Sequence, residues 1–154
     1  MYQQSLFGAP QVVQTSDDWY TPKWIFDTLG LQFDLDVAAP PGGIPWIPAH
    51  RHFTKEDDGL NRPWHGKVWM NPPFSAMTPW AMRFLKHRDG VALVPLTHNR
   101  WSQAVWSSDC RMVSLPHNLK FMRNGKPMGM PFPALLIAFT DECVEAISRI
   151  GKVR

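Results

Sequence analysis

The 154-residue sequence predicts an open α/β fold built around a mostly parallel sheet. Short strand-like apolar segments alternate with amphipathic segments at helical spacing, and a strong hairpin signal, Asn124-Gly125, lies towards the C-terminus. The 15 prolines also favour short segments joined by stiff loops over a helical bundle. We therefore expect a single domain over residues 17–154 with an antiparallel pair at its C-terminal edge, preceded by a polar, flexible arm at residues 1–16.

The first helix is expected to begin at Asp17 or Asp18, which can cap it, and to end at Gly30. Pro22 then lies just inside the helix. The segment 40–52 holds four prolines and few strand formers, so we expect a loop that packs Trp46 onto the domain. The apolar face of the first helix comprises Trp24, Ile25, Phe26 and Leu29; strands are expected at 33–39, 67–70, 90–96, 111–115 and 132–139, a hairpin at 117–130, and helices at 78–89, 101–106 and 142–150.

The composition narrows the class of protein. With 44% hydrophobic residues, including eight Trp, the chain can bury a core, and without a run of 18 apolar residues we expect no membrane span. The N-terminus lacks the basic and apolar regions of a secretory signal. Cys110 and Cys143 are far apart, which predicts reduced thiols in a cytoplasmic protein, with a disulfide as the alternative. The net charge of +3 is compatible with nucleic-acid binding and also with an ordinary solvated face.

The segment Asn71-Pro72-Pro73-Phe74 follows a predicted buried strand and is the strongest chemical signal in the chain. The prolines end the strand and hold the backbone in one stiff, extended geometry. The Asn71 amide oxygen and the Pro72 carbonyl then form two adjacent hydrogen-bond acceptors, which suit the two hydrogens of an exocyclic amino group. Phe74 could stack on the ring that bears this group, such as an adenine flipped out of a duplex. The alternative is a Pro-Pro turn with an incidental aromatic residue.

This tetrapeptide resembles the catalytic motif of amino-methyltransferases, (Asn/Asp/Ser)-Pro-Pro-(Tyr/Phe/Trp), and its surroundings resemble the short phage-type DNA N6-adenine methyltransferases. The resemblance implies a compact Rossmann-like methyltransferase fold, S-adenosylmethionine as cofactor, DNA as partner, and location in the bacterial host cytoplasm for a phage-encoded protein. It also implies catalytic roles for Asn71, Pro72, Pro73 and Phe74, with Asn favouring adenine N6 over cytosine N4. The matching pieces, in the family's order, are Asp18-Trp19-Tyr20-Thr21-Pro22, Phe33-Asp34-Leu35-Asp36-Val37-Ala38-Ala39, Asp58-Gly59-Leu60 with Trp64, Val68 to Phe74, and Pro131-Phe132-Pro133.

Asp36 is the first candidate for a cofactor ligand, because an open α/β sheet places its ligand groups at the carboxyl ends of its strands. The residues that follow, including Ala38, are small and would let a ligand approach; the alternative is a turn aspartate. Asp34 can face outward. The resemblance adds Trp19, Tyr20, Thr21, Pro22, Asp58 and Asn71 as candidate cofactor contacts.

The region between Asp36 and the catalytic strand is shorter than in a full methyltransferase sheet, so we expect a fold truncated there. The glycines that follow Asp36, Gly42 and Gly43, also come late for a cofactor loop. A solvated acidic turn is the alternative interpretation of Asp58.

Two basic segments are candidates for DNA contacts. Lys120, Arg123 and Lys126 fall around the Asn124-Gly125 turn, which would project them together. A second set, His98, Asn99 and Arg100, follows the predicted strand at 90–96, on the face that holds Asn71. Ordinary solvated charges are the alternative for both. His50 and His52 lack further ligands nearby, so we expect no metal site.

The function predicted by these residues is methyl transfer from S-adenosylmethionine to adenine N6 in DNA. The main alternative is a non-catalytic DNA-binding protein on a decayed methyltransferase scaffold, which the short cofactor region favours. A small-molecule or protein-glutamine methyltransferase is the third possibility, because Asn-Pro-Pro-Tyr also serves those enzymes.

Overall fold

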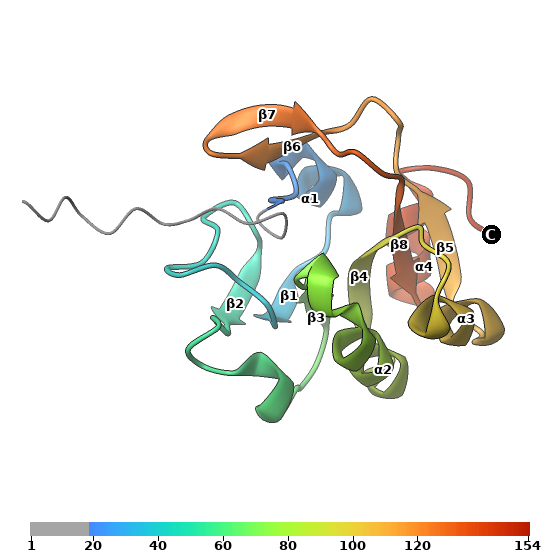
Figure 1. Cartoon of the computed structure of the whole chain (residues 1–154), viewed down its shortest axis with the longest axis horizontal. Helices are drawn as coiled ribbons and strands as arrows, with labels where there is room; N and C mark the ends of the chain where they lie inside the picture. The colour runs from blue at the N-terminus through green and yellow to red at the C-terminus, as the bar shows by residue number, and fades with distance from the viewer. Residues whose placement is uncertain (1–18) are drawn as a thin grey trace, which may run out of the picture.

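The computed structural model describes residues 19–154 and consists of a twisted sheet covered by helices on both faces, with a separate small hairpin (Figure 1). Strands β2, β1, β3 and β4 are parallel, β8 is antiparallel to its neighbours β4 and β5, and the strand order is β2-β1-β3-β4-β8-β5. The predicted α/β class and mostly parallel sheet are thus confirmed. The strand bounds are β1 Phe33–Asp36, β2 Ala49–His52, β3 Val68–Met70, β4 Gly90–Pro95, β5 Arg111–Ser114 and β8 Ala134–Ala138.

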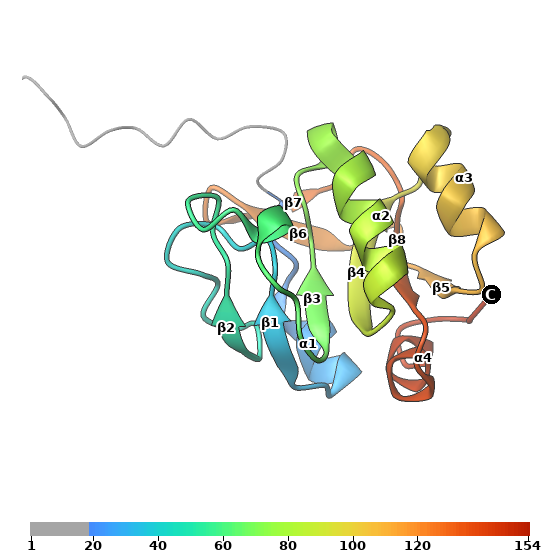
Figure 2. The same ribbon diagram turned by 90° about the horizontal axis from the view of Figure 1, so that it is seen from below.

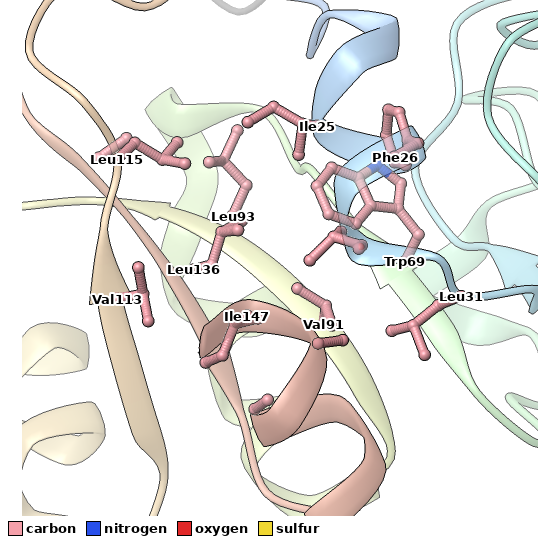
Figure 3. Close-up of a cluster of buried hydrophobic side chains, with 14 of the residues drawn as sticks. Ile25, Phe26, Leu31, Trp69, Val91, Leu93, Val113, Leu115, Leu136 and Ile147 are labelled. Carbon is pink, nitrogen blue, oxygen red and sulfur yellow. The ribbon is translucent and has the colours of Figure 1, made fainter. Parts of the chain in front are cut away.

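The sheet separates two hydrophobic clusters. Figure 2 shows the strands of this sheet side by side in the order given above. Helices α1 (Lys23–Leu29) and α4 (Asp141–Ser148) pack on one face, and α2 (Met77–His87) and α3 (Arg100–Ser107) on the other. Strand β4 serves both clusters, because alternate side chains point to opposite faces: Val91 and Leu93 join the α1–α4 cluster, and Ala92 and Val94 the α2–α3 cluster. Figure 3 shows the first of these clusters, in which Trp69 packs against Phe26.

The first helix differs from its prediction at its start. Helix α1 begins at Lys23 with Pro22 as its N-cap, and no side chain caps it. Gly30 ends it in the left-handed conformation, as predicted. Trp24 was expected on the buried face but is 44% exposed, because the core side of this short helix is filled by Ile25, Phe26 and Leu29. The predicted caps Asp17 and Asp18, and the predicted arm at residues 1–16, lie outside the described residues.

The segment 40–52 was expected to be a loop, and this is wrong for its last four residues. Ala49–His52 forms β2, a parallel edge strand whose register with β1 pairs Asp36 with His52. Polar residues are common on edge strands, so the propensity signal for β2 is weak. Trp46 does pack onto the domain, and its Nε1 donates to the Thr21 carbonyl (2.8 Å). Between β1 and β3 the chain holds only β2 and the 3-10 turn η1 (Gly59–Asn61), which agrees with the predicted truncation.

The predicted hairpin is present but stands apart from the main sheet. Strands β6 (Lys120–Arg123) and β7 (Lys126–Gly129) form their own antiparallel pair, joined at Asn124 and Gly125, which both have positive φ. Antiparallel pairing at the edge of the main sheet comes instead from β8 and β5.

The state of the two cysteines agrees with the expectation from the sequence. Cys110 and Cys143 are both buried and free, as predicted, and burial raises the pKa of both thiols. Within residues 19–154 no helix is long and apolar enough to span a membrane. The single-domain organisation of residues 17–154 stays a prediction.

Candidate functional site

A cavity of about 640 Å³ lies at the carboxyl ends of β1 and β3. This is the edge at which open parallel sheets place their ligands. The predicted residues that line the cavity are Trp19, Tyr20, Asp36, Ala38, Asp58, Asn71 and Pro73.

Asp36 stands at the end of β1 and is only 3% exposed. Its carboxylate has one resolved hydrogen bond, accepted from the Ala38 amide at 3.3 Å. Burial raises the pKa of Asp36 to about 7, and the Ala38 hydrogen bond opposes this shift only in part. A buried carboxylate that faces a cavity with so little compensation gains most from a cationic ligand.

Asn71 follows β3, and its side-chain amide is held by a residue from a distant segment of the chain. The Nδ2 group donates to the Trp19 carbonyl at 2.8 Å. A carbonyl can only accept, so this contact requires the amino side of the amide to face Trp19. The Asn71 Oδ1 is therefore the acceptor that this cavity-lining side chain has left for a ligand.

Trp19 is itself held by the β6–β7 hairpin. Its ring makes an edge contact with Phe121 (6.5 Å between centroids), and the Arg123 guanidinium lies 4.8 Å from the ring centroid. The next residue, Tyr20, exchanges two backbone hydrogen bonds with Met122, of 2.9 and 2.8 Å. The hairpin thus borders the cavity through Trp19 and Tyr20.

The Asp58-Gly59 turn forms another wall of the cavity. Asp58 is exposed, has a positive φ of 58° and accepts a hydrogen bond from Asn61 Nδ2 (2.7 Å). Gly59 has no room for a side chain, because a Cβ there would lie 2.3 Å from the Val37 carbonyl oxygen. Arg83 of α2 binds this turn by donating to the carbonyls of Gly59, Leu60 and Arg62, and its guanidinium stacks on Trp64.

The rest of the proline motif leads from β3 into α2. Pro72 is buried and Pro73 lines the cavity. Phe74 begins the 3-10 turn η2 (Phe74–Ala76) and is half-buried against Phe132, with 5.6 Å between the ring centroids. Phe74 does not line the cavity, so its predicted stacking on a substrate ring stays a prediction.

Two candidate cofactor contacts, Thr21 and Pro22, do not line the cavity. Thr21 is buried, and Pro22 caps α1. Asp34 is half-buried, and its carboxylate accepts from the Lys67 amide (2.7 Å), which ties β1 to the start of β3. Gly42 and Gly43 do not line the cavity; Gly43 packs against the His52 ring, and Gly59 is the glycine of the cavity wall.

The predicted DNA contacts are only partly brought together. Asn99 caps α3, where its Oδ1 accepts from Ser102 and its Nδ2 donates to Thr97, whereas His98 and Arg100 are exposed. On the hairpin, alternation places Arg123 and Lys126 on one face and Lys120 on the other. The expectation that the turn projects all three cations together is therefore wrong, because Lys120 is an odd number of residues from Arg123.

Sequence reasoning missed several cavity residues because it missed β2. The chain beyond the carboxyl end of this strand supplies Thr54 and Lys55, and the preceding loop supplies Ile44 and Ile47. Because no local signal marks a strand at 49–52, the sequence did not locate these residues. Ala39, Pro40 and Pro41, which belong to the small residues expected to let a ligand approach, also line the cavity. The lining residues that were not predicted are Val37, Trp69, Ser75, Ala76 and Trp80.

In the described part of the chain, no group of three or more His, Cys, Asp or Glu side chains could hold a metal ion. A family model for DNA N-6-adenine-methyltransferase (Dam) matches residues 9–125, which is most of the chain and includes the cavity. No curated protein and no solved structure matches the chain.

Proposed function

The chain belongs to the DNA N-6-adenine-methyltransferase family, and from this premise we propose that it transfers the methyl group of S-adenosylmethionine to the N6 amino group of adenine in DNA. At the level of the family it is a DNA adenine methyltransferase. The observation that carries the finer proposal is the pairing, in one cavity, of a buried carboxylate at the end of β1 with an oriented amide at the end of β3.

The cavity residues fit S-adenosylmethionine. The cavity volume of about 640 Å³ lies within the usual range of roughly 300–1,000 Å³ for sites of small molecules and cofactors. Asp36 would hold the ammonium group of the methionine part. This cation would stabilise the carboxylate in place of the water that burial removes. When bound, this cofactor supplies a methyl group activated by a sulfonium centre.

The apolar walls formed by Ile44 and Ile47 suit the adenosine part, and Asp58 can accept from its ribose or amino group. The strand order, with β8 as the antiparallel strand, supports a Rossmann-like methyltransferase fold in which the two βα units of a full methyltransferase sheet are reduced to β2 and the turn η1 between β1 and β3.

Asn71 acts on the target amine. The lone pair of an aromatic amino group is delocalised into its ring, so the nitrogen is a poor nucleophile. A hydrogen bond accepted by Asn71 Oδ1, with a second accepted by the Pro72 carbonyl, localises this lone pair on the nitrogen. The Trp19 carbonyl keeps Oδ1 turned towards the substrate before it arrives, so little reorganisation is needed during the reaction.

The test is transfer of tritium from labelled S-adenosylmethionine to unmethylated duplex DNA, followed by analysis of the nucleosides. We expect N6-methyladenine with the wild-type protein and about 10²–10³ times less per unit time with Asn71→Ala. N4-methylcytosine as the product would overturn the base assignment. Binding of DNA without transfer would favour a non-catalytic DNA-binding protein, and labelling of protein or small molecules alone would favour the third class of methyltransferase.

A further inference from the structure

The orientation of the Asn71 amide depends on a segment that is distant in sequence. The Trp19 carbonyl that accepts from Nδ2 is separated from Asn71 by 52 positions, and the stiff Pro72-Pro73 segment only fixes the backbone. A displacement of Trp19 would therefore leave the Asn71 backbone in place and release its side chain. The direction of Oδ1, the hydrogen-bond acceptor in the proposed reaction, would then no longer be fixed.

Trp19 in turn is held by the hairpin. It is only 5% exposed, with Arg123 over the face of its ring and Phe121 at an edge-to-face angle of 89°. The Tyr20–Met122 bridge adds a backbone connection directly beside it. Both backbone groups of Met122 point to Tyr20, so Pro127, which is opposite Met122, loses no ladder hydrogen bond by lacking an N–H.

The β6–β7 hairpin also has exposed side chains that a partner could contact. A two-stranded hairpin alone is marginally stable, so its order depends on the contacts with Trp19 and Tyr20. Its remaining cations, Lys120 and Lys126, are exposed on opposite faces, and Gly129 lies beside Lys120. One element therefore carries two exposed cations and also contacts, through Arg123 and Phe121, the tryptophan that supports the Asn71 amide.

We propose that the β6–β7 hairpin positions the Asn71 amide, with Arg123 as a positioning residue that acts through Trp19. This inference rests on the proposed function, because it assigns the reaction to Asn71. It replaces the expectation that Arg123 binds a DNA phosphate. Phosphate binding on the hairpin then belongs to Lys120 and Lys126.

The test compares Arg123→Leu with Arg88→Leu. Arg88 also stacks on a ring, with its guanidinium 4.2 Å from the Phe139 centroid. It comes just before β4 and so lies at the amino ends of the strands, whereas the cavity lies at the carboxyl ends of β1 and β3. With saturating DNA and cofactor, we expect Arg123→Leu to lower kcat by about 2- to 30-fold, the range of a cation–π contact, while the salt dependence of DNA binding is unchanged. Arg88→Leu should leave kcat unchanged.

A second measurement does not depend on activity. The side-chain NH₂ resonances of Asn71, assigned by their loss in Asn71→Ala, should shift in Arg123→Leu and stay in place in Arg88→Leu. Arg123→Lys, which keeps a cation over the ring, should restore part of kcat and serves as the test if the leucine variant fails to fold.

Three outcomes are distinguishable. If Arg123→Leu keeps kcat and the Asn71 resonances but loses about 0.9 from the slope of log affinity against log salt, Arg123 is a phosphate contact and the inference is overturned. If the wild type transfers no methyl group, the proposed function fails, and the resonances alone decide whether the hairpin orients Asn71. If Arg88→Leu lowers kcat equally, the effect is one of general stability and the inference also fails.

Discussion

Asp36 and Asn71 stand at the carboxyl ends of neighbouring parallel strands and face the same cavity, yet their surroundings are opposite. Asp36 is an ionisable group, almost fully buried, with one long hydrogen bond of 3.3 Å from a backbone amide. Asn71 is a neutral group, half-buried, with one end of its amide bound at 2.8 Å to a distant carbonyl.

The difference separates binding from orientation. A desolvated carboxylate costs free energy until a cation pairs with it, so Asp36 is suited to draw a charged ligand into the cavity. A clamped amide gains little from a ligand but presents its oxygen in one direction, so Asn71 is suited to act on a group that must be aligned. The comparison predicts that changes at Asp36 affect stability and cofactor affinity, whereas changes at Asn71 affect turnover.

The largest effect is expected for Asn71→Ala. Loss of one preorganised hydrogen-bond partner of a transition state costs about 10²–10³ in rate, so kcat should fall by this factor. Cofactor affinity measured by calorimetry should stay within about twofold, because the role proposed for Asn71 is on the amine and not on the cofactor. Near wild-type turnover would contradict the role of Asn71, and a parallel loss of cofactor affinity would remove the contrast with Asp36.

The pH dependence of stability isolates Asp36. The folded pKa of about 7 lies above the usual value, so the ligand-free fold is most stable with Asp36 protonated and loses this stability as the pH rises from about 4 to about 7. The rise of the Asp36 pKa from 3.8 to about 7 corresponds to a loss of roughly 4 kcal/mol in the free energy of unfolding across this pH range. Asp36→Asn mimics the protonated form and should remove this dependence.

Urea unfolding of the wild type and Asp36→Asn at several pH values checks this prediction. The two free energies of unfolding should be similar near pH 4. From there to about pH 7 the variant should become increasingly more stable than the wild type, and above about pH 7 the difference should be constant. The other titrating groups cancel in the difference. A difference that does not change with pH would show that Asp36 is not a desolvated acid.

Cofactor affinity should move in the opposite direction. Asp36→Asn loses a hydrogen bond between charged groups, so we expect S-adenosylmethionine to bind about 10- to 100-fold more weakly although the fold is more stable. In the wild type, affinity should fall as the pH drops below about 7, because protonated Asp36 no longer pairs with the ammonium group. Calorimetry at pH 6 and 8 measures both effects, and unchanged affinity in the variant would assign the ammonium group to another residue.

Asn71→Asp tests the clamp itself. An ionised carboxylate cannot donate to the Trp19 carbonyl, so we expect a loss of about 1–3 kcal/mol in the free energy of unfolding at neutral pH. A protonated Asp can donate, so part of the loss should return below about pH 4. If Asn71→Asp is as stable as the wild type at pH 8, the Trp19 contact does not hold the amide.

The smallest effect concerns the hairpin lysines. Replacement of Lys120 and Lys126 by Ala should flatten the slope of log DNA affinity against log salt by about 2, because each phosphate contact contributes roughly 0.9. The kcat on saturating DNA should be largely unchanged. An unchanged slope would make them solubilising charges and would move the DNA surface to His98 and Arg100.

The local sequence was sufficient wherever one segment carries its own signal. Burial on both faces predicted β4, the Asn124-Gly125 pair predicted the hairpin turn, and Gly30 predicted the end of α1, because periodicity and positive φ are properties of consecutive residues. The positions of Asp36 and Asn71 followed from the same logic, since each comes at the end of a strand.

The tertiary structure alone decided what surrounds these residues. Strand β2 exists because β1 offers a parallel edge for pairing, and nothing in the polar segment Ala49–His52 indicates it. The clamp on Asn71 comes from a backbone carbonyl 52 positions away, and every residue has such a group, so no side chain marks it. Alternation along β6 and β7 set which hairpin cations share a face. A chain encodes the conformation of neighbouring residues directly, whereas contacts between distant segments depend on how the sheet brings them together.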